Sequence, residues 1–141
     1  MRARYLTAPI ILGIVIGAIA MSPGSYASAL DHQRWKSRIL VIVAPPGNAA
    51  VKTQRHIYES AANGMAERSI VLAEALDDSG RSREIRSRLN ADGRRFQVFL
   101  IGKDGHTAVA SDKPLSAEDL FARVDAMPMR QDEMRRSRSH R

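Results

Sequence analysis

The segment from Phe96 to Ala110 constrains the fold of this chain more than any other. Phe96 to Ile101 is a run of mostly apolar, β-favouring residues, and Thr107 to Ala110 is a shorter run of the same kind. Lys103-Asp104-Gly105 separates them, and its Asp-Gly pair favours the positive φ angles of a tight turn. We therefore predict a β-hairpin, against which the rest of the chain must pack.

Apolar runs and capping signals predict further elements before and after this hairpin. Arg38 to Ala44 is a continuous apolar run after its first residue, which is typical of a central strand covered on both faces. Asn48 can cap the helix that follows the first strand. Ser116 is a helix cap with acidic residues in the turn that follows, and Pro128 is expected to end that last helix. The predicted elements are a strand over 38–44, a helix over 49–62 closed by Asn63-Gly64, a strand over 69–76, a helix over 82–90, the hairpin, and the helix after Ser116.

Two side chains of these elements have alternative interpretations. Gln54 is the polar exception on the apolar stripe of the first helix. We expect a partly exposed amide at the edge of the stripe, with a functional group near the start of the helix as the alternative. Trp35 precedes the first strand, and we expect its large ring to pack against that strand.

The first 29 residues have the pattern of an export signal. Arg2 and Arg4 form a positive start, residues 10–21 are apolar or glycine, and Ala27-Ser28-Ala29 offers the small residues of a cleavage site. The apolar run is shorter than the roughly 20 residues that span a bilayer. We predict a signal peptide over 1–29, cleaved after Ala29 or after Ala27, with an uncleaved N-terminal anchor as the alternative. A domain over 30–129 and a basic tail over 130–141 then lie in the periplasm or cell envelope.

Composition excludes several classes of protein. The chain has 141 residues and no cysteine, so thiol chemistry is excluded because its attacking group is a thiolate. The formal charge is +7, and three of these charges come from residues 130–141, so the folded body is closer to neutral. Nucleic-acid binding requires a basic folded face with aromatic residues, and we expect no nucleic-acid partner. The basic tail is expected to be solvated, with at most an accessory contact to an anionic membrane surface.

The resulting order, β-α-β-α-β-β-α, is that of a thioredoxin-like α/β domain, a three-layer sandwich with helices on both faces of the sheet. Particular segments add to this order: Trp35 to Pro45, Gly64 to Arg68, Leu100 to Gly105 and, most specifically, Val124 to Arg130 with its Asp-Ala-Met-Pro-Met-Arg sequence. In these segments the chain resembles the P-DUDES family of exported bacterial thioredoxin- and peroxiredoxin-like domains. The resemblance implies a thioredoxin-like fold, an exported location and no established activity.

The chain departs from the catalytic thioredoxin pattern at two positions. Pro45-Pro46-Gly47-Asn48 occupies the loop in which a redox cysteine pair would lie, and Arg95 or Phe96 stands where a cis proline would be expected. A cis bond before a residue other than proline costs about 2.5–4 kcal/mol, so we expect a trans bond there. Both positions fall at the same end of the sheet in that fold, so the two departures together remove the redox site. We therefore exclude an oxidoreductase.

Histidines and carboxylates offer other chemistry. His56 and Glu59 lie three residues apart on one predicted helix face, a spacing that two metal ligands could use, but no third ligand lies nearby in the sequence. We therefore assign no metal, no cofactor and no catalytic residue. His106, beside the hairpin turn, is expected to be solvated, with contact to an acidic ligand as the alternative.

The segment Met127-Pro128-Met129 has two interpretations. The methionines form either an adaptable apolar plug against the sheet or the lip of a partner-binding site. Arg130 has two as well. It either pairs with Asp125 or Glu133, or reaches with Arg135 for a carboxylate or phosphate of a ligand.

These observations favour a non-catalytic binding or interaction module of the periplasm or cell envelope. Its partner is an unknown protein or a small anionic ligand. The free N–H groups at the start of the first helix would attract an acidic group of that partner. The candidate binding residues are Pro45, Pro46, Gly47, Asn48, Arg95, Phe96 and Arg130. The alternative is a cysteine-independent enzyme, with acid–base or hydrolytic activity that draws on His56, Glu59 or Asp77.

Overall fold

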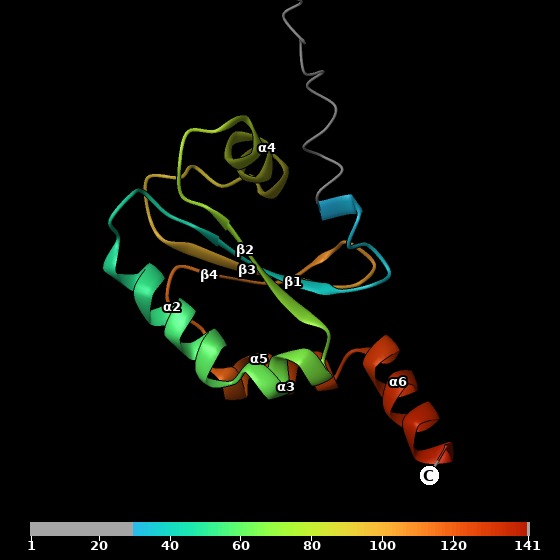
Figure 1. Cartoon of the computed structure of the whole chain (residues 1–141). Coiled ribbons are helices and arrows are strands. Elements are labelled where there is room, and N and C mark those ends of the chain that lie inside the picture. The colour runs from blue at the N-terminus through green and yellow to red at the C-terminus, as the bar shows by residue number, and fades with distance from the viewer. Residues whose placement is uncertain (1–29, 141) are drawn as a thin grey trace, which may run out of the picture.

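A computed structural model describes residues 30–140, in which a four-stranded sheet lies between helices (Figure 1). The predicted signal peptide over 1–29 lies outside these residues. In the described part of the chain, no helix is both long enough and apolar enough to cross a membrane. The elements in chain order are β1 (Arg38–Val43), α2 (Ala49–Ser60), α3 (Ala62–Glu67), β2 (Ile70–Ala75), α4 (Gly80–Leu89), β3 (Gln97–Ile101), β4 (Thr107–Ser111), α5 (Ala117–Asp125) and α6 (Pro128–Ser139).

The sheet has the strand order β2-β1-β3-β4. β1 runs parallel to β2, which is reached through α2 and α3, and antiparallel to β3. β3 and β4 form the predicted hairpin. Figure 1 shows α4 on one face of the sheet and α2, α3 and α5 on the other. The predicted α/β architecture is therefore confirmed, and its topology is consistent with a thioredoxin-like arrangement.

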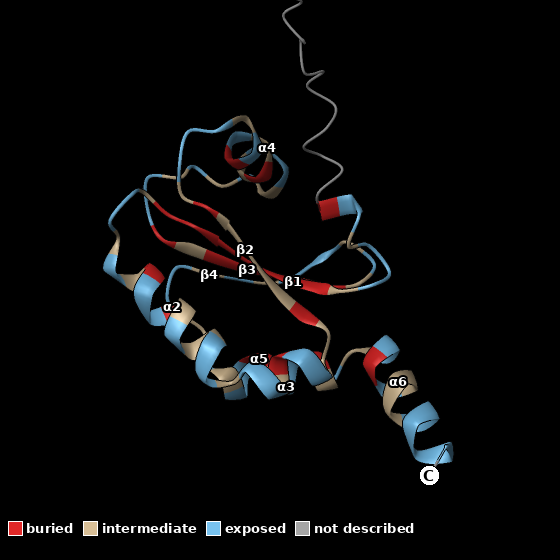
Figure 2. Cartoon of the chain, viewed as in Figure 1, coloured by how far each residue is buried: buried red, intermediate tan, exposed pale blue. Residues whose placement is uncertain are grey.

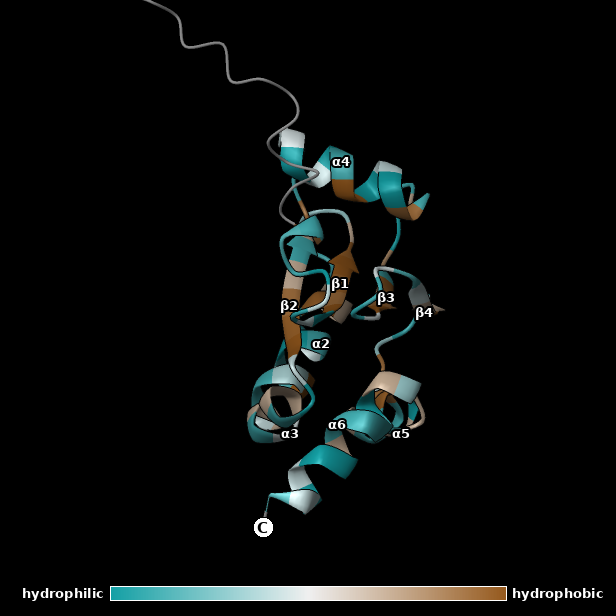
Figure 3. Ribbon diagram, turned by 90° about the vertical axis from the view of Figure 1, so that its right-hand side faces the viewer, coloured by the Kyte–Doolittle hydropathy of each residue, from teal (hydrophilic) through white to brown (hydrophobic). Residues whose placement is uncertain are grey.

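The core lies on both faces of β1. All six residues of this strand are buried (Figure 2). The unbroken apolar run over 39–43 predicts this for five of them, and Arg38 is buried as well. Leu40 and Ile42 pack toward the face covered by α2, α3 and α5, whereas Val41 and Val43 pack toward α4. The alternation follows from the two-residue period of a strand. Figure 3 shows hydrophobic strands between helices that are mostly hydrophilic, α6 among them.

Two of the predicted helix caps are confirmed. The Asn48 side chain accepts a hydrogen bond from the Ala50 N–H at 3.0 Å, at the start of α2. Ser116 accepts one from the Asp119 N–H at 3.0 Å, at the start of α5. Both side chains satisfy donors that the first turn of a helix leaves free.

The predicted stop at Asn63-Gly64 is wrong. The first helix breaks at Ala61, and Gly64 lies inside α3. A Cβ atom on Gly64 would lie 2.4 Å from the Phe121 ring of α5. The glycine is therefore explained by the close approach of two helices and not by the end of one.

Two side chains lie in surroundings opposite to those predicted. Gln54 is fully buried, and its amide donates to the Leu115 carbonyl at 3.1 Å while its oxygen accepts from the Leu115 N–H at 2.8 Å. This pairing satisfies an amide that would otherwise be too costly to bury. Trp35 is 62% exposed, and its ring does not pack into the core. Its φ of 68°, uncommon for a residue with a side chain, turns the chain just before β1.

The C-terminal segment also differs from the prediction. α5 ends at Asp125, and Pro128 is the first residue of α6 rather than a terminator. Proline suits this first position because its φ is already helical and its missing N–H would have had no helical partner. The predicted solvated tail is thus largely helical, and Arg130 at its start is buried.

Candidate functional site

The two ends of the sheet have different chemistry. The residues after β1 and before β3 lie together at one end, because Val43 pairs with Gln97 in antiparallel register. The start of β1, the turn between β3 and β4, and the junction of α5 with α6 meet at the other end. The sequence assigns most of the candidate binding residues to the first end.

At that first end, part of the predicted surface is available. Pro46, Gly47 and Arg95 are exposed, and Pro45 and Asn48 are half-buried. The Asn48 side chain already caps α2, so one of the N–H groups expected to attract an anion is occupied. No peptide bond among the described residues is cis, which agrees with the trans bond expected before Phe96.

Two of the predicted binding residues are not on this surface. Phe96 is buried among the core residues on the α2 side of the sheet, because it continues the inward alternation of β3. Arg130 lies at the opposite end of the sheet, where carboxylates hold its guanidinium. The candidate surface therefore reduces to the loop over 45–48 and Arg95.

A charged hollow of about 320 Å³ lies beside this loop, lined in part by Pro45, Asp77, Arg86 and Arg94. The Asp77 carboxylate accepts hydrogen bonds from the Ser82 and Ser79 hydroxyls, and these lower its pKa to about 2. Arg86 donates to the Asp77 carbonyl at 2.7 Å. Asp77 is thus an ionised group that organises the loop before α4. A carboxyl group that donates a proton at neutral pH would need a raised pKa instead.

The histidine and carboxylates proposed for catalysis do not converge. His56 is exposed on α2, with its Nε2 3.4 Å from the Ser60 hydroxyl, and is not among the residues that line the hollow. Glu59 is exposed on the same helix. Among residues 30–140, no three His, Asp or Glu side chains are arranged to hold a metal ion.

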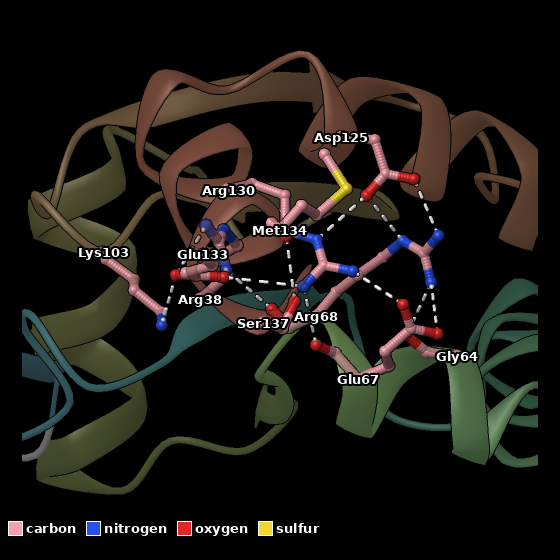
Figure 4. Close-up of polar contacts among 10 residues, drawn as sticks. All are labelled: Arg38, Gly64, Glu67, Arg68, Lys103, Asp125, Arg130, Glu133, Met134 and Ser137. Atoms are coloured by element: carbon pink, nitrogen blue, oxygen red, sulfur yellow. Dashed lines mark hydrogen bonds and ion pairs between the residues drawn. The ribbon is translucent and has the colours of Figure 1, made fainter. Parts of the chain in front are cut away.

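At the other end of the sheet, four basic and three acidic side chains form a connected network (Figure 4). Its innermost member is Arg38, the first residue of β1, which is 1% exposed. The two terminal nitrogens of Arg38 each lie 3.3 Å from a carboxylate oxygen of Glu133 in α6. Lys103, from the hairpin turn, donates to the same carboxylate at 2.7 Å. Glu133 therefore ties the first strand and the hairpin to the last helix.

Arg68 and Arg130 extend this network toward α3 and α5. Both contact Asp125: Arg68 donates to it at 3.0 and 2.7 Å, and Arg130 donates at 3.1 Å. Arg130 also donates to the Glu67 carboxylate at 2.7 Å and to the Glu67 carbonyl at 3.1 Å. The expectation that Arg130 pairs with Asp125 or Glu133 is confirmed, with Glu133 the more distant at 3.7 Å.

The network favours the ionised forms of Glu133 and Asp125. Burial alone would raise the pKa of Glu133, but hydrogen bonds from Lys103 and Arg38 outweigh it, so the pKa lies below the usual value. The same balance lowers the pKa of Asp125, where Arg68 and Arg130 are the donors. Partly buried charges are thus matched by partners, as their desolvation requires.

An apolar groove opens beside the network, between the hairpin and the α5–α6 junction. Its volume is about 240 Å³. Its lining is mostly apolar surface from Ala108, Met127, Pro128 and Met129, and its charged or polar lining comes from Arg38, Lys103, Asp104 and His106. The two methionines thus line the groove, as the lip interpretation expects, although Met127 also packs against the core. Both interpretations of this segment have support.

Two large apolar side chains are exposed in the described part of the chain, and both flank the hairpin turn. Met129 is 38% exposed and lines the groove together with Lys103. Trp35 is 62% exposed, and its backbone N–H donates to the Lys103 carbonyl at 2.7 Å. Of the two, Met129 lies at the groove itself, and an exposed apolar side chain beside an apolar hollow is typical of protein-binding surfaces.

Sequence reasoning missed Arg38, Arg68 and Lys103 as members of a common site. One signal was available: an arginine at the start of a fully buried strand needs an acidic partner. The identity of that partner was not available, because Glu133 lies 95 residues away.

Comparison with known proteins gives a family for the chain. A search of curated proteins found no match. A family model described as a domain of unknown function, DUF4174, matches residues 29–133. This range includes the whole sheet, the groove and the network as far as Glu133. The chain therefore belongs to the DUF4174 family.

Proposed function

We propose that this protein is a non-catalytic interaction module that docks another protein in the periplasm or cell envelope. The absence of cysteine means that it is not a thiol–disulfide oxidoreductase, even though its topology is consistent with a thioredoxin-like arrangement. The finer likeness of its Val124 to Arg130 segment to the P-DUDES group belongs to the same proposal, as does export through the signal pattern over 1–29.

The observation that carries the proposal is the apolar groove with Trp35 and Met129 around the hairpin turn. Small-molecule sites enclose about 300–1,000 Å³, whereas this groove has about 240 Å³, and Met129 in its lining is 38% exposed. It is better suited to one apolar side chain of a partner than to a whole small ligand. Interfaces gain most of their affinity from a few such anchors in apolar hollows.

The groove is a better docking surface than the loop over 45–48. The hollow beside that loop is lined by Asp77, Asp78, Asp92, Arg86 and Arg94, so a partner would have to displace water from mixed charges. The enzyme alternative gains no support from His56, whose Nε2 lies 3.4 Å from the Ser60 hydroxyl and not beside a carboxylate of the hollow. Contact of the basic end of α6 with anionic lipid remains an accessory part of the proposal.

The experiment is site-specific photo-cross-linking in the organism that makes the protein. A photoreactive amino acid replaces Met129, and as a matched control it replaces Ala62, which is exposed on α3. We expect an adduct with one envelope protein from position 129, absent at position 62 and absent when Ala108→Leu fills the groove. An adduct that forms equally at both positions, or that survives the filled groove, would contradict docking there.

Cell fractionation tests the location. We expect the chain in the periplasmic or envelope fraction, shortened by cleavage after Ala27 or Ala29. If the segment is an uncleaved anchor, the full-length chain should be in the membrane fraction. Full-length protein in the cytosolic fraction would contradict export.

A further inference from the structure

We propose that the partner binds as an extended strand along the edge of β4, inserts one apolar side chain into the groove, and places an acidic side chain beside Lys103. This inference rests on the proposed function, because it specifies the partner of the same groove. It adds the backbone conformation of that partner, the class of its anchor and the sign of its charge.

The edge of β4 is suited to accept a strand. β4 is the last strand of the sheet in the described part of the chain, so one row of its backbone N–H and C=O groups has no strand beside it. It contains neither proline nor a charged residue over Thr107–Ser111, and charges begin only at Asp112. An edge without these protections can add a further strand, the main-chain hydrogen bonds supplying affinity and a side-chain pocket supplying specificity.

A β-bulge connects this edge to the groove. Leu100 pairs with Val109, but the next residue of β3, Ile101, pairs with Thr107. Ala108 is therefore the additional residue, and it lines the groove. Bulges redirect side chains next to binding sites. Because Ala108 is small, this redirection leaves space where a partner side chain can enter.

The free donors of a lining cation favour an acidic partner. Arg38 and Lys103 line the groove with one carboxylate, Asp104, whereas Glu133, which pairs with both cations, is not among the lining residues. The Asp104 carboxylate accepts the backbone N–H of His106 at 3.0 Å, so it is engaged within the turn. Lys103 donates one bond to Glu133, and an ammonium group has three protons to donate. Lys103 therefore retains donors for a carboxylate of the partner.

That carboxylate belongs to a side chain and not to the end of a chain. Capture of a terminal carboxylate uses a nest of free backbone N–H groups. In the hairpin turn, the N–H of Gly102 donates to the His106 carbonyl at 2.9 Å, and that of Gly105 donates to the Gly102 carbonyl at 3.0 Å. The His106 N–H is engaged as well, so we assign the partner's carboxylate to the Lys103 side chain.

The experiment selects peptides against the full-length protein. The library displays randomised segments of about seven residues, the length of an ordinary strand, between constant flanks so that no free carboxyl terminus is present. We expect enriched sequences that combine one large apolar residue with Asp or Glu next to it or two positions away. Enrichment without an acidic preference, or no enrichment at all, would overturn the inference.

One enriched peptide is then synthesised and its Kd measured by calorimetry. Replacement of its acidic residue by the matching amide should weaken binding about fivefold or more, as loss of a charged contact does. N-methylation of alternate backbone nitrogens should abolish binding in one register and spare it in the other, because only one set of amides faces β4. The proposed pairing would be overturned if N-methylation weakened binding equally in both registers. It would also be overturned if replacement of the acidic residue by its amide left the Kd unchanged.

Matched variants of β4 place the site. Ala108→Leu should weaken the peptide about tenfold by filling the groove. Ala110→Leu is the control, because Ala110 is exposed on the same strand but pairs with Phe99 on the opposite face of the sheet, and it should leave the Kd within about twofold. Equal losses in both variants would overturn the placement in the groove.

Two further outcomes separate this inference from the proposed function. Sedimentation that shows a dimer lost in Ala108→Leu would assign the groove to a second copy of the chain and overturn both. The second outcome is a partner that cross-links at position 129 and is displaced neither by the acidic peptide nor by its N-methylated forms. This result would overturn the inference alone and leave the interaction module intact.

Discussion

Arg38 and Glu133 lie 95 residues apart in the chain, and the two terminal nitrogens of the arginine each lie 3.3 Å from a carboxylate oxygen of Glu133. Arg38 begins the central strand and Glu133 lies in the last helix, so this pair joins the start of the sheet to the end of the chain. Arg38 is almost fully buried, whereas Glu133 is 28% exposed at the surface. The carboxylate therefore compensates a buried charge that β1 cannot compensate itself.

Glu133→Gln should destabilise the protein by about 2 kcal/mol. Removing one partner of a buried pair costs about 3–5 kcal/mol, and the partial exposure of Glu133 reduces this figure. The substitution keeps the shape of the side chain but leaves Arg38 and Lys103 without their shared negative partner. Urea unfolding followed by circular dichroism measures the change.

Asp132→Asn is the matched control for this substitution. Asp132 is the neighbouring residue of α6, and it pairs with Arg135, which is 70% exposed. Exposed pairs contribute about 0–1 kcal/mol, so this variant should stay close to the wild type. Equal unfolding free energies for the two variants would show that the Arg38–Glu133 pair has no special weight.

Asp77→Asn should lower stability at neutral pH and lose this effect in acid. Hydrogen bonds from Ser82 and Ser79 lower the pKa of Asp77 from 3.8 to about 2. A carboxyl group whose pKa is lower in the folded state stabilises the protein at pH values above its unfolded-state pKa. This contribution disappears as the pH falls from about 4 through about 2. Urea midpoints of the variant and the wild type, measured from pH 7 to pH 2, should therefore converge at the acid end.

Asp112→Asn, at an exposed carboxyl after β4, is the control for the pH series. We expect its curve to run parallel to that of the wild type. A constant gap between Asp77→Asn and wild type down to pH 2 would assign the effect to packing and not to ionisation of Asp77.

Gly64→Ala should destabilise the protein by about 1–2 kcal/mol. Alanine usually stabilises a helix by about 1 kcal/mol over glycine, but here its Cβ would lie 2.4 Å from the Phe121 ring. The Arg68 guanidinium also lies over that ring, 4.3 Å from its centroid, which limits how far the ring can move, and overpacking follows. Thermal unfolding should show a lower Tm.

Asn63→Ala tests the same helix without the clash. Asn63 is exposed in α3, and alanine there should raise the Tm slightly through helix propensity. If Gly64→Ala raised the Tm as Asn63→Ala does, the close approach of α3 and α5 would not constrain this position.

Local patterns in the sequence predict most of the architecture. The apolar run after Arg38 indicates a buried central strand, and Asp104-Gly105 indicates the hairpin turn. The caps Asn48 and Ser116 mark the starts of two helices correctly. These signals suffice because strand burial, tight turns and helix caps depend on residues that are close in sequence.

Tertiary contacts explain the failures. The burial of Gln54 depends on Leu115, 61 residues away, and no stripe on the first helix reveals that pairing. Gly64 has the pattern of a helix stop, but its role is contact with Phe121. Trp35 has the size of a core residue, yet it lies at a turn of positive φ and is exposed. Each error arises where a distant partner or a backbone turn overrides local preference.

The candidate site was predicted only in part. Met127-Pro128-Met129 carries a lip interpretation in the sequence, and Arg130 is correctly expected to have an acidic partner. The cations at the start of β1 and in the hairpin turn join this segment only after the sheet has formed. The groove is therefore a product of topology, since β1, the hairpin and the α5–α6 junction meet at one end of the sheet.

The most direct test of docking at the groove is a methyl-resolved NMR titration of the full-length protein with the enriched acidic peptide. With ¹³C-methyl methionine labelling, we expect the Met127 and Met129 signals to shift on saturation, while that of Met65, buried in the core, stays in place. Unchanged Met127 and Met129 signals with the peptide fully bound would contradict a docking site at this groove.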